Sequence, residues 1–192
     1  MLNNINNTTF GAKLRITTPV KDNVRLQNIQ KAFAEKTAEI NDTLSMTRLG
    51  EDWNNMECYY LGTNQDKAVG GFFKTSLDSM METLSDNDIV TKLVKTLKAM
   101  KELNKREGAC LGFEDGKYRA EHEQKRNLLI AQNCREKGDE VMAGRFEFLA
   151  GCFGKKLAKI EAEETKINNR FLERLNAIAD GDEDILNLKE SM

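Results

Sequence analysis

The chain has 192 residues, of which 40% are hydrophobic and 31% are charged, and its formal net charge is −2. This balance excludes an intrinsically disordered chain, and it lacks the excess of positive charge that marks many nucleic-acid-binding proteins. No apolar run approaches the roughly 20 residues that a membrane span needs. We therefore expect a soluble globular protein of one domain.

The cysteines indicate neither a metal site nor a disulfide framework. Cys58, Cys110, Cys134 and Cys152 lie far apart without a C-x-x-C pair, and the chain contains a single histidine, so the usual zinc spacings are absent. Residues 1–9 lack the basic and apolar regions of a secretory signal peptide. We therefore expect reduced thiols, a cytoplasmic location, and neither metal nor cofactor.

The first part of the chain predicts a strand followed by a helix. After a flexible tail (1–9), hydrophobic and polar residues alternate from Phe10 to Thr17, which is typical of a strand with one wet face. Apolar residues then recur at helical spacing over Asn23–Glu39. Either Thr18-Pro19 or Asp22 is suited to begin this helix.

From Asp42 onward the spacing changes from that of a helix to that of strands. Turn-forming residues separate three segments, Thr43–Leu49, Asn55–Leu61 and Lys67–Phe73. With the strand at Phe10–Thr17 as a fourth member, they predict a small antiparallel sheet.

Helices are predicted from residue 77 onward. A short one covers Leu77–Leu84, and the next begins where Ser85 and Asp88 stand at capping-box spacing. A glycine-rich loop over Gly108–Gly116 ends that helix, and another follows over Tyr118–Lys137.

One long helix, from Asp139 to Ile178, organises the second half of the chain. Its large apolar residues recur with an average step of about 3.6, the period of a straight α-helix. Its first half also has a second apolar face with Phe148 and Cys152, and the small residues Gly144, Gly151 and Ala158 recur there every seven residues. Because that half is apolar on several sides, we expect a central helix that other helices approach closely.

These elements predict an α+β fold in which a small antiparallel sheet (β-α-β-β-β) precedes a helical half built round one long C-terminal helix. The sheet region covers residues 10–84 and the helical region covers 85–192. We expect the two regions to form one cooperative unit, and a sheet domain joined to a separate helical bundle is the alternative.

A row of basic side chains follows one side of the helix after Ser85, because its members are spaced mostly by three or four residues. The row consists of Lys92, Lys95, Lys98, Lys101, Lys105 and Arg106. Such a row suits phosphate groups or an acidic partner. It lacks interleaved aromatic side chains, so solvation of the helix or pairing with the acidic C-terminal segment is the preferred interpretation.

Two further residues, Cys110 and His122, are candidates for a chemical role. Cys110 lies in the glycine-rich loop, where we expect the most accessible thiol, and a reactive role would require a lowered pKa. His122 stands between two glutamates, but neither lies three or four residues away, as helical metal pairs do. We interpret His122 as a solvated helix residue.

No motif in the chain identifies a family. The leading hypothesis is a non-enzymatic cytosolic protein that binds another protein, or serves a structural role, through its helical surface. The alternative is nucleic-acid or ribosome-associated binding through the Lys92–Arg106 face. A third hypothesis is an enzyme that uses Cys110 or a carboxylate in a pocket between the sheet and the helices.

Overall fold

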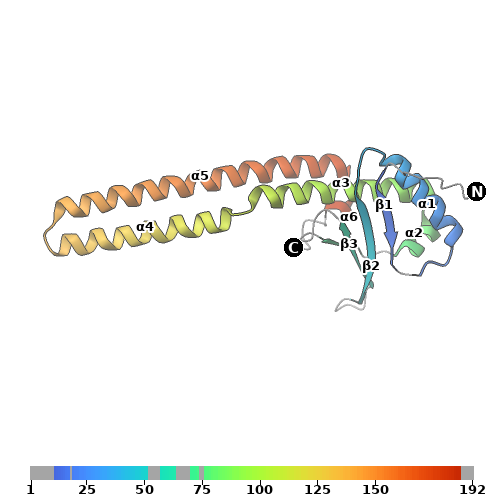
Figure 1. Cartoon of the computed structure of the whole chain (residues 1–192), viewed down its shortest axis with the longest axis horizontal. Coiled ribbons are helices and arrows are strands. Elements are labelled where there is room, and N and C mark those ends of the chain that lie inside the picture. Colours follow the sequence, from blue (N-terminus) through green and yellow to red (C-terminus); the bar gives the residue numbers. More distant parts are fainter. Residues whose placement is uncertain (1–10, 18, 52–56, 64–69, 74–75, 187–192) are drawn as a thin grey trace, which may run out of the picture. The chain divides into compact units, whose positions relative to one another are not determined.

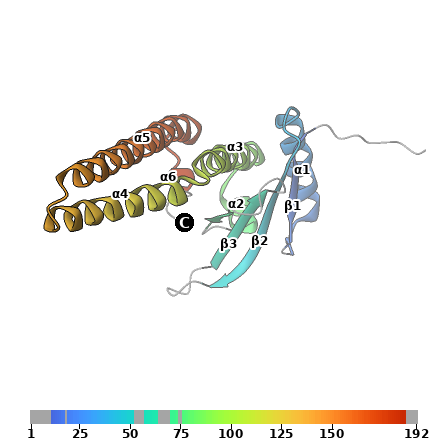
Figure 2. The same cartoon turned by 60° about the vertical axis from the view of Figure 1, so that its left-hand side comes forward.

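The structure, a computed structural model, describes residues 11–17, 19–51, 57–63, 70–73 and 76–186, of which 48–51, 57–63 and 70–73 are described by their backbone alone. The chain forms two compact units (Figures 1 and 2). Unit 1 comprises Met1–Asn104 and Glu173–Met192, and unit 2 comprises Lys105–Leu172. The division falls within two helices, α3 (Asp86–Cys110) and α5 (Glu140–Ala179), rather than in a linker. That the regions 10–84 and 85–192 fold cooperatively stays a prediction.

Unit 1 begins with β1 (Lys13–Ile16), α1 (Asn23–Lys36) and β2 (Thr43–Glu51). The side chain of Asp22 accepts a hydrogen bond of 2.9 Å from the backbone N–H of Arg25, so Asp22 is the N-cap of α1. The helix carries the chain back to the end of the sheet from which it started. β2 therefore runs parallel to β1, with Leu14 beside Leu44 and Ile16 beside Met46.

The predicted fold class, an α+β fold with a small antiparallel sheet, is wrong. Helices make up most of the described chain, and the strand pair that packs into the core, β1 with β2, is short and parallel. The prediction placed the first strand as a fourth member of an antiparallel sheet, although a helix that connects two neighbouring strands is typical of a crossover with parallel pairing. Beyond β2 the backbone continues through β3 (Glu57–Thr63) and β4 (Gly70–Phe73), in the sheet order β1-β2-β3-β4.

The core of unit 1 is built on α3. As the sequence predicts, this helix is preceded by a cap, in which the backbone N–H of Asp88 donates to Oγ of Ser85 at 3.2 Å. α3 carries nine buried residues, and further buried residues lie on the strands, on α1, on α2 (Leu77–Thr83) and on α6 (Glu183–Leu186). The largest side chains in this core with less than 2% exposure include Ile29, Phe33, Leu44, Met46, Met80, Ile89, Leu93, Leu97, Met100 and Ile185.

Unit 2 is a helical hairpin of α4 (Phe113–Glu136) and the greater part of α5, which run antiparallel side by side (Figures 1 and 2). Gly138, with a φ of 77°, turns the chain between them, and the Asp139 side chain accepts a 3.0 Å bond from the N–H of Met142. The fully buried side chains along the hairpin are alanines, namely Ala120, Ala131, Ala143 and Ala150. Small residues let the two helices approach closely.

The predicted long helix is confirmed, since α5 is one helix of 40 residues. The prediction that other helices closely approach α5 on several sides is wrong for its second apolar face. A side-chain carbon added at Gly144 or Gly151 would meet no atom within 4 Å, and Phe148 is 72% exposed. The apolar period shows which residues avoid water, but it does not show that the same chain covers every apolar face.

The predicted loop over Gly108–Gly116 is also wrong. α3 continues through Gly108 to Cys110, and α4 begins at Phe113, so the connection is only a tight turn at Gly112, whose φ is 86°. A glycine inside a helix costs only about 1 kcal/mol relative to alanine, which the flanking helix-forming residues can offset. The positive φ makes Gly112 the residue that ends the helix.

Candidate functional site

The basic row lies largely within unit 1, where its first members pair with the end of the same chain. The Lys92 ammonium contacts two carboxylates, those of Asp182 at 3.6 Å and Asp184 at closer range. Lys95 donates to the backbone oxygen of Ala179 at 3.1 Å and lies 3.5 Å from Asp180. The acidic residues after α5 thus neutralise the beginning of the row, as one of the two preferred interpretations expects.

The remaining members differ in exposure. Lys101 lies 3.7 Å from the completely buried carboxylate of Asp42, whereas Lys98 and Lys105 are exposed. Arg106, in unit 2, donates from Nε to the Asn168 side chain at 2.7 Å, and its guanidinium lies 5.6 Å from the centre of the Phe171 ring. Most of the predicted basic row is therefore engaged within the chain. Its use in binding stays a prediction.

Cys110 is half-buried beside a cavity of about 560 Å³ in unit 2, which is lined by Arg106, Glu107, Cys110, Leu111, Gly112, Glu114, Asp115 and Glu164. Burial raises the pKa of the Cys110 thiol, and the nearby Arg106 charge lowers it only in part. A raised pKa reduces the thiolate fraction, so this environment does not favour a reactive role. Among the described cysteines, Cys152 is exposed and Cys110 is not.

His122 lies on the exposed side of α4, with 62% of its side chain accessible. Its ring stacks on Tyr118, with ring centres 6.1 Å apart, and Nδ1 lies 4.0 Å from the Glu123 carboxylate. Within the described residues, no three side chains of His, Cys, Asp or Glu are grouped so that they could hold a metal ion. None of the described helices is both long and apolar enough to cross a lipid bilayer.

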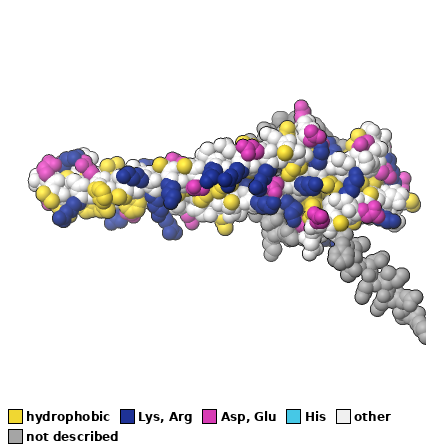
Figure 3. All heavy atoms as spheres, turned by 90° about the horizontal axis from the view of Figure 1, so that it is seen from above, with side chains coloured by type: hydrophobic (Ala, Val, Ile, Leu, Met, Phe, Trp, Pro, Cys, Tyr) yellow, Lys and Arg dark blue, Asp and Glu magenta, His cyan; other side chains and the backbone are white. Residues whose placement is uncertain are grey.

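Most of the exposed large hydrophobic side chains in the described part of the chain lie in unit 2. Seven of the nine such side chains in the described part of the chain belong to unit 2: Leu111, Tyr118, Leu128, Leu129, Val141, Phe148 and Leu149. Figure 3 shows hydrophobic side chains gathered near the end of the hairpin where α4 joins α5, with lysines and arginines along the adjacent surface. Apolar side chains that gather on an exposed surface commonly mark a site of interaction.

Within this surface, one line of residues forms what we call the outer face of α5. It consists of Val141, Gly144, Phe148, Gly151 and Cys152. Steps of three, four and seven place them along one side of the helix. Val141 and Phe148 are 70% and 72% exposed, and the two glycines leave shallow gaps beside them.

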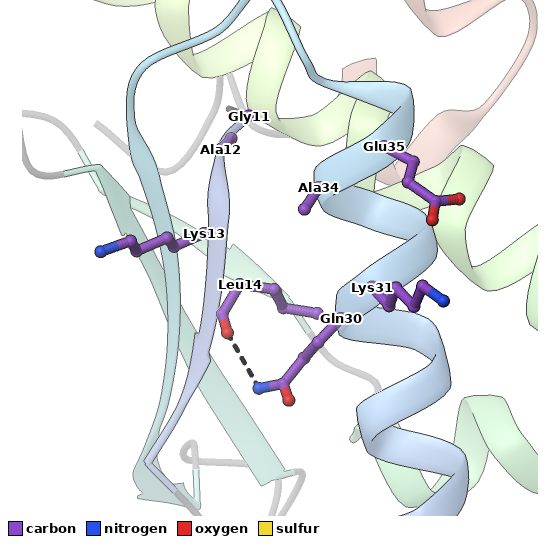
Figure 4. Close-up of a pocket in the computed structure, with 8 residues that line it drawn as sticks. All are labelled: Gly11, Ala12, Lys13, Leu14, Gln30, Lys31, Ala34 and Glu35. Carbon is purple, nitrogen blue, oxygen red and sulfur yellow. Dashed lines mark hydrogen bonds between the residues drawn. The ribbon is translucent and has the colours of Figure 1, made fainter. Parts of the chain in front are cut away.

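A second candidate lies in unit 1, where a groove runs between β1 and α1 (Figure 4). Its volume is about 510 Å³, and it is lined by Gly11, Ala12, Lys13, Leu14, Gln30, Lys31, Ala34 and Glu35. From α1, the side-chain Nε2 of Gln30 donates to the backbone oxygen of Leu14 at 3.0 Å. A side chain added at Gly11 would lie 2.2 Å from the backbone oxygen of Ala34, so only glycine allows the start of β1 to approach α1 this closely.

Comparison of the chain with protein-family models, with curated proteins and with solved structures returns no match.

Sequence reasoning missed the groove. The alternation at Phe10–Thr17 indicates a strand with one wet face, but it does not show that this strand lies at the edge of the sheet. The signal that was available is Gly11, which lies two residues before β1 and suits a close approach of two backbones.

Proposed function

We propose that this chain is a non-enzymatic protein-binding module and that the outer face of α5 is its contact surface. The observation that carries this proposal is the 72% exposure of Phe148 on a helix in which Ala143 and Ala150, on the other side, are buried. Large aromatic side chains at the centre of an apolar patch supply much of the affinity in protein interfaces. A cytoplasmic location is part of the proposal, in keeping with the free thiols of Cys110, Cys134 and Cys152.

The shape of the outer face suits a helical partner. Gly144 and Gly151 leave space within 4 Å of their backbone, so a second helix has room to pack closely there, with Val141 and Phe148 beside it. The charged side chains around it, such as Arg145 and Lys155, are exposed and form a polar rim.

Affinity capture from the native cell tests the proposal. The full-length protein is compared with a Val141→Ser, Phe148→Ser variant and with a Val24→Ser control. Val24 is 71% exposed on α1 in unit 1, so the control removes an equally accessible apolar side chain elsewhere. We expect the hairpin variant to lose a protein that both the parent and the control retain.

Retention of the same proteins by all three forms would contradict the proposal, and so would loss by the Val24→Ser control as well. Because surface substitutions usually change stability by no more than about 0.5 kcal/mol, the variants should unfold at nearly the same denaturant concentration. A large shift in that midpoint would show that Phe148 is structural, which also contradicts an exposed contact surface.

A further inference from the structure

β1 has a free edge. It is the first strand in the sheet order β1-β2-β3-β4, so it has a neighbour on one side only within the described sheet. The N–H of Lys13 donates to the Asp42 oxygen at 2.9 Å, and the N–H of Thr17 donates to the Met46 oxygen at 3.1 Å. Alternate residues of β1 therefore point their backbone groups at β2, and Leu14 and Ile16 point theirs at the outer edge.

The outer edge is only partly satisfied. Gln30 Nε2 donates to the Leu14 oxygen, in the place where the N–H of a further strand would donate. Among the described residues, no other hydrogen bond reaches the outward backbone groups of Leu14 and Ile16. An edge of this kind is a template for another extended chain.

The groove beside this edge has room for side chains that an added strand would direct toward α1. Leu14 and Ala12 form its buried floor, and Ala34 forms part of its wall on α1. Its volume of about 510 Å³ lies within the range of ligand pockets in proteins, about 300–1,000 Å³. Apolar side chains that point from an added strand toward α1 would be removed from water there.

The face of β1 that carries Lys13 and Arg15 favours acidic side chains on an added strand. Lys13 and Arg15 are both exposed and lie on the same face of the strand, two residues apart. Side chains on an added strand would stand directly beside them, where opposite charges stabilise the pairing and like charges weaken it. An added strand therefore matches β1 best when apolar residues alternate with acidic ones.

We propose that the outer edge of β1 and the groove beside α1 bind an extended peptide segment of another protein, in which apolar and acidic residues alternate, and that this segment joins the sheet as a strand next to β1. This inference concerns unit 1 and is independent of the role proposed for the outer face of α5.

The probe is a capped seven-residue peptide in which valine alternates with glutamate, titrated into the full-length ¹⁵N-labelled protein. We expect saturable binding and at least tenfold slower hydrogen exchange of the Leu14 and Ile16 amides. A peptide that alternates valine with lysine should bind at least tenfold more weakly. A glutamate peptide that is N-methylated at the backbone nitrogens facing β1 should not bind, because methylation removes the N–H groups that a strand requires.

A charge-reversal variant provides the matched control. Lys13 and Arg15 are exposed, so Lys13→Glu together with Arg15→Glu should leave the fold intact and reverse the preference in favour of the lysine peptide. If the glutamate peptide does not bind at a concentration of about 1 mM, the proposal is wrong, because a dissociation constant above this value is too weak to indicate a specific site. Equal binding of the N-methylated peptide, or an unchanged preference in the charge-reversal variant, would also overturn it.

Hydrogen exchange measured without peptide shows whether the same chain or a second copy of the protein already occupies the edge. Slow exchange of the Leu14 and Ile16 amides at every protein concentration would assign the edge to residues 1–10 of the same chain. Protection that increases with protein concentration would assign it to a second copy. Either result would overturn the proposal of a peptide from another protein.

Discussion

The Nζ atom of Lys101 on α3 lies 3.7 Å from Oδ2 of Asp42, whose side chain is completely buried at the start of β2. The other carboxylate oxygen of Asp42 accepts a 2.7 Å bond from the backbone N–H of Thr43. A buried carboxylate is costly without an opposite charge. This pair therefore joins the parallel strand pair to the central helix of unit 1.

Replacing Lys101 by Met should destabilise the fold by about 2–3 kcal/mol, because it leaves the Asp42 charge buried without this ammonium group. The figure is below that for a fully buried pair, since Lys101 is 28% exposed and solvent screens part of the interaction. Chemical denaturation measures the change. Lys98→Met, on the exposed side of the same helix, is the control and should stay within about 0.5 kcal/mol. Equal effects of the two substitutions would contradict this role of Lys101.

Nucleic acid should not bind measurably at about 0.15 M salt, because Lys92, Lys95 and Lys101 already face carboxylates of the same chain. Fluorescence anisotropy with labelled duplex and single-stranded DNA measures this. The opposite result is saturable micromolar binding that a Lys95→Gln, Lys98→Gln variant loses. That outcome would favour the alternative function of the basic row, and the affinity should then fall with salt by a log–log slope of about −0.9 per duplex phosphate contacted.

Burial predicts a ranking of core substitutions that differs between the two units. Leu97 in α3 is completely buried, so Leu97→Ala should destabilise the protein by about 3–5 kcal/mol. Phe153 in α5 is only half-buried, so Phe153→Ala should cost about 1–2 kcal/mol despite the larger side chain. Denaturation of both variants checks the ranking, and a larger loss for Phe153→Ala would mean that the hairpin is more deeply covered than unit 1.

Thiol alkylation should modify Cys152 before Cys110 in the folded protein, because Cys152 is exposed and burial raises the pKa of Cys110. The alkylation rate of Cys110 should reach half of its maximum at a higher pH in the folded than in the unfolded chain. Below the ordinary thiol pKa, Cys110 is protonated in both the folded and the unfolded state, so its contribution to stability is constant there. Stability then declines as pH rises from the ordinary thiol pKa through the raised pKa of the folded state. Mass spectrometry of partly alkylated protein gives the order, and faster labelling of Cys110 would contradict it.

Gly144→Ala should stabilise the protein by about 0.5–1 kcal/mol, because alanine is the better helix former and the added methyl group meets no atom within 4 Å. Thermal unfolding of the isolated protein measures the gain. The same substitution should weaken capture of any partner that packs against the outer face of α5, since it fills the gap at that position. Destabilisation of the isolated protein would show that another element already covers Gly144.

Local signals in the sequence determine where three of the helices begin. Asp22, Ser85 and Asp139 each precede a helix, and each side chain accepts a bond from a backbone N–H three residues later. Such bonds depend only on neighbouring residues, so spacing along the chain is sufficient to predict them. The 40-residue α5 is predictable for a similar reason, because one helical period persists through it.

The tertiary structure alone decides which faces meet. The sequence anticipates that the basic row pairs with the acidic C-terminal segment, but only the tertiary structure pairs Lys92 with Asp182 and Asp184. The register of β1 with β2 and the groove beside β1 likewise join residues far apart in the chain. The sequence pattern shows that the outer face of α5 is apolar, but not that it stays uncovered. Periodicity specifies the side of an element that avoids water, whereas its partner depends on the packing of all elements at once.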